Sequence, residues 1–278
     1  MAHNLNNIIV DRVLRGVFSD KDDNIIFSLN QVQDLSMNQT SESQEITDAL
    51  GVSIMELMRS KALEVSANNA IYDFSLLSAQ YGTEKVEVGT NVTAPMMETI
   101  EVPAAAEGAT TVVVSLAHIP SKAPTAVYAL NNDSTLGAKY EMGTAGGAGK
   151  FAYDPEVEIE KDGKTVTVAQ ITLPKAAANT DVFVMYEYET TKAIEVVNSA
   201  NNFAKMGKMT FEILAYDVCD PETKLFGYLI LPRFQLSNDF DWSIGGDSQQ
   251  HAFSGKAHVD YCKKDKEMCR VVIVDDEE

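Results

Sequence analysis

Two histidines and two cysteines near the C-terminus are the only metal-like cluster in the sequence. His251, His258, Cys262 and Cys269 combine imidazole and thiol groups, which are the preferred ligands of zinc. Their spacing matches no common zinc finger, and successive residues of a β-strand point to opposite faces. We therefore interpret them as ordinary strand residues and expect no bound metal. A chelator that lowered the melting temperature would contradict this interpretation.

Two further segments could bind an ion or a phosphate. The acidic run Asp20–Asn24 could hold calcium, but it lacks the spaced glycine and terminal glutamate of a calcium loop, so we predict an acidic β-turn. The glycine run Gly143–Gly149 lacks a Lys-Ser/Thr ending and a following helix, which favours a flexible loop over a phosphate site. The sequence contains no nucleophile-elbow or zinc-protease motif and no plausible triad. The sequence therefore predicts that the protein is not an enzyme and binds no cofactor.

Composition indicates a soluble globular chain that is made in a cytoplasm. The 278 residues are 45% hydrophobic and contain no apolar run long enough to span a bilayer. Three cysteines, all late in the chain, fit a reducing compartment. The net charge of −19 is spread as −8 over Met1–Ile100, −6 over Glu101–Thr190 and −5 over Thr191–Glu278. This negative charge disfavours tight binding of nucleic acid. It either keeps the protein soluble or prevents its surface from adhering to DNA or to another anionic partner.

The N-terminal third alternates between apolar and polar residues, as half-buried strands do. Ile25, Phe27 and Leu29 follow this period of two. The segment Asn38–Gln44 has no apolar residue, so we predict that it is a solvated hairpin tip or a docking loop. The segment Val52–Ser60 fits either a strand or a helix.

One amphipathic helix is predicted after these strands. Apolar residues recur at helical spacing from Ala67 to Tyr81. Ser66 is placed to cap the start of this helix, and Gly82 to end it in a left-handed conformation. A single helix among many strands is expected to cover one end or one face of a sheet.

The middle of the chain, residues 91–190, reads as a separate small β-sandwich. Short apolar runs alternate there with proline and glycine breaks, and Lys161–Lys164 has the form of a hairpin turn. Residues 1–90 and 191–278 are each short of core residues. We therefore predict that they form one discontinuous β-domain, into which the sandwich is inserted.

Two segments carry a resemblance to a known family. They are Ile25–Gly82 and the C-terminal region that contains Leu229–Phe234, Asp239–Ile244 and Phe253–Ala257. Together they cover about half of the chain and resemble the tail-tube (major tail) proteins of long-tailed bacteriophages. The resemblance implies a mainly β fold: a tail-tube-like β-sandwich or barrel with one flanking α-helix, plus an inserted small immunoglobulin-like β-sandwich.

The resemblance also implies a function in the virion tail, after synthesis in the host cytoplasm. Subunits would form rings, expected to be hexameric, that stack into a tube for genome ejection. The chain would contact copies of itself and the sheath, tape-measure, baseplate and tail-terminator proteins; DNA would pass without specific binding, and no membrane would be involved. The expected ring-stacking loop is Asn38, Gln39, Thr40, Ser41, Glu42, Ser43 and Gln44. The candidate acids of the channel lining are Asp34, Glu45, Asp48 and Glu64.

Other classes remain open at this point. A capsid decoration protein or another minor virion protein could use the inserted sandwich to bind surfaces. A surface adhesin could use the same sandwich to bind glycans. Electron microscopy separates these hypotheses, because a tube subunit gives stacked rings or hollow tubes, whereas the others give compact monomers or trimers.

Overall fold

The computed structural model describes residues 5, 7–161, 163–219, 222–241, 250–261 and 264–275. The fold is mainly β with one α-helix in the described residues, and it contains two sheets, one of them a curled half-barrel. The predicted fold class is thus confirmed. The chain divides into two compact units: unit 1 joins the residues up to Lys85 to those from Val196 onward, and unit 2 is Val86–Glu195.

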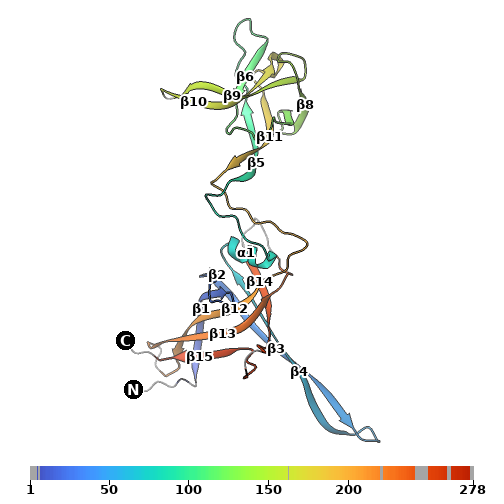
Figure 1. The fold of residues 1–278 in the computed structure, drawn as a ribbon, viewed down its shortest axis with the longest axis vertical. Coiled ribbons are helices and arrows are strands. Elements are labelled where there is room, and N and C mark those ends of the chain that lie inside the picture. The colour runs from blue at the N-terminus through green and yellow to red at the C-terminus, as the bar shows by residue number, and fades with distance from the viewer. Residues whose placement is uncertain are drawn as a thin grey trace. The chain divides into compact units, whose positions relative to one another are not determined.

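Unit 1 is built on one antiparallel sheet to which both ends of the chain contribute (Figure 1). Its strands follow the order β2-β1-β12-β13-β14-β4-β3, and β15 also pairs with β13. Because β1 pairs with β12, and β4 with β14, neither half of the unit can complete the sheet alone. The strands are β1 (Ile8–Ser19), β2 (Ile25–Leu29), β3 (Val32–Thr47), β4 (Ser53–Asn69), β12 (Met206–Asp217), β13 (Lys224–Leu236), β14 (His251–Ala257) and β15 (Arg270–Val274).

Alternating side chains of this sheet form the core of unit 1. Phe18, Phe211, Phe234 and Phe253 are all fully buried in one cluster, although they come from four different strands. The helix adds Leu76 to the same cluster. The sheet therefore curls around its apolar face, and the opposite face carries the polar residues of each strand.

The helix α1 (Phe74–Tyr81) is shorter than the sequence predicts. The expected start at Ala67 with a cap at Ser66 is wrong, because both residues lie in β4 and pair with β14. The cap is instead Asp73, whose carboxylate accepts hydrogen bonds from the backbone N–H groups of Ser75 and Leu76, both at 2.8 Å. Gly82 ends the helix with φ 68°, as predicted.

We expect Asp73→Ala to lower the free energy of unfolding of unit 1 by about 1 kcal/mol, because two N–H groups of the first turn lose their acceptor. Urea denaturation measures this loss. Asp73→Asn keeps an acceptor oxygen and is the matched control. Equal losses in the two variants would show that the cap is not the cause.

Unit 2 is a seven-stranded arrangement around a core of its own, with the order β5-β11-β7-β8-β9-β10-β6. Phe151, Ile171 and Val184 are among its fully buried residues. Its elements are β5 (Val92–Glu101), β6 (Thr111–Ser115), β7 (Ala126–Leu130), β8 (Leu136–Met142), β9 (Lys150–Lys161), β10 (Lys164–Pro174), the 3-10 turn η1 (Lys175–Ala177) and β11 (Asp181–Thr190).

The first and last strands of unit 2 pair with each other over their whole length. Val92 lies opposite Thr190, and Glu101 lies opposite Asp181. The chain therefore enters and leaves unit 2 at neighbouring points, as a unit inserted into another chain requires. The likeness to immunoglobulin domains stays a prediction. Asp162, in the predicted turn between β9 and β10, lies outside the described residues.

Candidate functional site: the projecting hairpin

The β3–β4 hairpin extends beyond the sheet that holds its base (Figure 1). The two strands pair from Val32 and Asn69 to Thr47 and Ser53. However, β14 pairs with β4 only between Leu63 and Asn69. The outer part of the hairpin is therefore a two-stranded ribbon, and nearly all of its side chains are exposed. Such a ribbon is marginally stable in water by itself.

A tight turn at residues 48–52 forms the tip of this hairpin. The carboxylate of Asp48 accepts hydrogen bonds from the N–H groups of Leu50 and Val52, both at 2.8 Å. Gly51 adopts φ 82°, a conformation that costs glycine little. The turn leaves the Leu50 side chain 89% exposed. Leu50 thus presents an exposed apolar side chain on a turn that is closed by its own hydrogen bonds.

The predicted position of the tip at Asn38–Gln44 is wrong. These residues belong to β3 and pair with residues of β4 from Leu57 to Glu64. Both faces of the ribbon are exposed to solvent there, so the strand needs no apolar residues. Its polar composition therefore resembles that of a loop. Arg59 donates to the Gln44 side chain at 2.6 Å, which ties the two strands together. The ambiguous segment after Val52 is strand β4.

The two faces of the outer hairpin differ in chemistry. Glu45 lies directly opposite Glu56, so one face presents two carboxylates side by side. On the other face, Ile46 lies opposite Met55, and Leu57 is the next residue of β4 on that face. The sequence pattern hid this arrangement because a register shift after Glu42 changes which residues of β4 share a face.

The four acids predicted for a channel lining do not form one cluster. Asp34 and Glu64 belong to the part of the hairpin near the sheet, where Glu64 forms an ion pair with Lys256 at 3.0 Å. Glu45 lies on the outer ribbon, and Asp48 closes the tip. Asp34 adopts φ 52° at an irregularity in β3. The acids thus fall into an inner pair and an outer pair.

The structure separates the histidines of the candidate zinc cluster. His251 is the first residue of β14, and His258 directly follows the last one, so the two lie roughly 20 Å apart at the usual rise per residue of a strand. His251 is buried and bonds to the Gln80 side chain at 2.8 Å, and His258 bonds to that of Gln235 at 3.1 Å. Cys262 lies outside the described residues, within which no group of three metal-ligating side chains occurs.

The environment of His251 predicts a pH-dependent stability of unit 1. Burial lowers the pKa of His251, and the charge of Asp73 partly opposes this shift. As the pH falls below about 6.5, the imidazole ring takes up a proton in the unfolded chain but stays neutral in the folded state. Stability must fall as the pH falls through this range, by at most about 1.4 kcal/mol per pH unit for this one group.

Urea denaturation at pH 7.5 and at pH 5.5 measures this effect. His251→Gln retains a polar partner for Gln80 but cannot be protonated, so we expect a smaller loss of stability between the two pH values. An equal loss in the variant and the wild type would assign the pH dependence to other groups.

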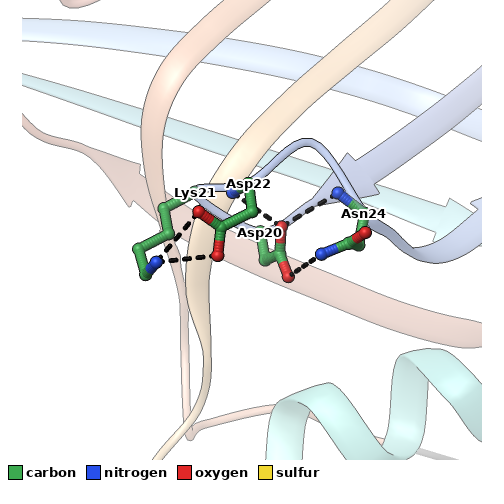
Figure 2. A network of polar contacts seen from close by, with 4 residues as sticks. All are labelled: Asp20, Lys21, Asp22 and Asn24. Carbon is green, nitrogen blue, oxygen red and sulfur yellow. Dashed lines mark hydrogen bonds and ion pairs between the residues drawn. The ribbon is translucent and has the colours of Figure 1, made fainter.

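The acidic segment after β1 is a turn in which the Asp20 carboxylate accepts hydrogen bonds from neighbouring residues (Figure 2). Asp20 accepts from the N–H of Asp22 at 2.8 Å, and from the N–H and the side-chain amide of Asn24, both at 2.9 Å. Lys21 pairs with Asp22 at 2.7 Å. These hydrogen bonds lower the pKa of Asp20. The carboxylate therefore stabilises the turn between β1 and β2.

The glycine-rich segment lies between two strands. Gly143–Gly149 connects β8 to β9, so a strand follows it, where a phosphate loop would have a helix. The sequence predicts that Trp242 anchors a core or an interface, but Trp242 lies outside the described residues.

Unit 1 thus combines a curled, mainly antiparallel sheet with a projecting, solvent-exposed hairpin. Residues 8–272 match the YomU/Tube protein family, and the chain belongs to this family. The family name indicates a tube-type structural protein of a phage, and so a component of the virion tail; such proteins are generally not enzymes. A comparison with curated proteins finds no match. Within the described ranges, no helix is long and apolar enough to cross a membrane.

Proposed function

We propose that this protein is the subunit of a phage tail tube, in which copies form hexameric rings that stack around a channel for the genome. The observation that carries this proposal is the outer β3–β4 ribbon. Its exposed side chains include Leu50, Ile54 and Met58, which are between 65% and 89% exposed. A ribbon that carries apolar residues and pairs only with itself gains its stability from a partner.

Unpaired strand edges support assembly within a ring. β2 and β3 end the sheet path, and β2 covers β1 only from Gly16 onward. In the described part of the chain, no strand is hydrogen-bonded to the outer edge of β3 or to that of the first half of β1. Exposed edges of this length invite pairing with another chain, and a closed ring of subunits would satisfy them.

The acidity of the chain supports a channel through which DNA slides. A net charge of −19 repels the phosphates of DNA. Under this proposal Asp34 and Glu64 are the acids that approach the channel, and the outer pair serves contacts between rings. The sheath, tape-measure, baseplate and tail-terminator proteins are the further partners that we propose for such a tube.

Electron microscopy of the purified full chain, together with analytical sedimentation, tests this function. We expect stacked rings or hollow tubes whose formation increases with protein concentration. Compact monomers or trimers at every concentration would overturn the proposal and favour a decoration protein or an adhesin.

A further inference from the structure

A notch opens on unit 1 where strand β14 ends. β4 continues past the end of β14 to Lys61 and beyond, and on β13 the residue Arg233 lies between the segments that pair with β14 and with β15. The resulting cavity has a volume of about 370 Å³. The lining residues that matter here, which we call the notch, are Lys61, Met206, Arg233, His258, Tyr261 and Met268.

The notch combines positive charge with exposed apolar surface. In the described residues neither Lys61 nor Arg233 forms an ion pair, and the Arg233 guanidinium instead lies 3.1 Å from the Met206 sulfur. The ammonium group of Lys266 lies 5.5 Å from the ring centre of Tyr261, a side chain that is 80% exposed. Methionine and tyrosine in a basic setting suit an acidic partner with apolar side chains.

The outer part of the hairpin, residues 42–58 on both sides of the tip, has this complementary chemistry. Residues 42–58 contain no lysine, arginine or histidine. Their acidic members are Glu42, Glu45, Asp48 and Glu56. Their exposed apolar members are Ile46, Leu50, Val52, Ile54, Met55 and Met58. The outer hairpin thus carries both acidic and exposed apolar side chains, and residues 42–58 contain no basic group among them.

A tip cannot reach the notch of its own chain. Lys61 lies near the base of the hairpin, eight residues after the start of β4 at Ser53, and this separation corresponds to roughly 25 Å of extended strand. The partner must therefore be a second copy. Because the tip and the notch are different surfaces, their contact is heterologous, and a heterologous contact that does not close into a ring propagates as an open stack.

We propose that the hairpin tip of one subunit docks into the notch of a subunit in the next ring, with its carboxylates against Lys61 and Arg233 and with Leu50 against Met206 and Tyr261. This inference rests on the proposed tube function and assigns the surface that receives the hairpin.

Photo-crosslinking tests the contact directly. A benzophenone amino acid replaces Leu50 in the full chain, the protein is assembled and irradiated, and the crosslinked peptides are mapped by mass spectrometry. We expect crosslinks from position 50 to peptides that contain Met206, Arg233 or residues 257–268. If tubes form but their crosslinks map elsewhere, the proposed contact with the notch is wrong and the tube function still stands. If the wild-type chain forms no tubes, both proposals are wrong.

Charge reversal tests the complementarity. We expect Lys61→Glu/Arg233→Glu and, separately, Glu45→Lys/Glu56→Lys to raise the protein concentration needed for assembly about tenfold or more. The quadruple variant should recover much of the loss, because each reversed surface again meets its opposite. Lys164→Glu/Lys192→Glu in unit 2 is the control with the same change of net charge as the notch variant, and melting temperatures verify folding. Normal assembly of the notch variant, or a quadruple variant no better than either double variant, would contradict the proposal.

Discussion

Deleting residues 43–47 and 53–58 should abolish tube assembly while unit 1 stays folded. The deletion removes paired segments of β3 and β4 and keeps the turn at residues 48–52. None of the removed residues belongs to the core, and β4 keeps all of its pairing with β14. The variant should therefore retain its melting temperature to within a few degrees, and sedimentation should show unassembled subunits at concentrations where the wild type forms tubes.

A second hairpin in the chain provides the matched control. β9 and β10 pair at Glu158 with Thr167 and at Ile159 with Val166, and deleting these four residues shortens the hairpin of unit 2 in the same way. This control should assemble like the wild type. Tubes formed by the shortened β3–β4 variant would remove the hairpin from any role in assembly. A shortened variant that unfolds would show that the ribbon contributes to the fold, contrary to our interpretation.

The sequence predicted features that depend on neighbouring residues. The alternation at Ile25–Leu29 identified a strand with Phe27 and Leu29 buried, and Gly82 marked the end of the helix. The errors arose where distant pairing decides the structure. Ala67 fits a helix locally, yet it pairs with Phe253, far along the chain, and that pairing holds it in β4. Local propensity is a weak guide in such cases.

The same limit applied to the candidate sites. A polar run such as Asn38–Gln44 is indistinguishable from a loop unless its partner strand is known, because an exposed ribbon needs no apolar face. Lys61 and Arg233 share the notch although they are far apart in the sequence, and no motif connects them. His251 carries metal-ligand chemistry, but its partner Gln80 makes it a buried structural residue. Composition thus identified the classes of residues, and only the fold brought them together.

Gly255→Ala should strongly destabilise the sheet of unit 1. A Cβ at this position would lie 2.4 Å from the carbonyl oxygen of Gln235 and 2.4 Å from Cζ of Phe234. The backbone oxygen belongs to the neighbouring strand β13, and the phenylalanine is fully buried, so neither can move freely. β14 would have to shift away from β13 while still paired with β4. We expect a loss of about 3 kcal/mol in the stability of unit 1.

Hydrogen exchange followed by mass spectrometry measures this loss for each unit separately, which a single melting curve of a two-unit chain does not. Protection should fall in β14, β13 and β4, and that of β10 in unit 2 should stay unchanged. Ser254→Ala is the control, since Ser254 lies on the opposite face of β14 and is not part of the core. Because β14 borders the notch, Gly255→Ala should also impair assembly, whereas unchanged protection in β14 would show that the sheet accommodates a methyl group at position 255.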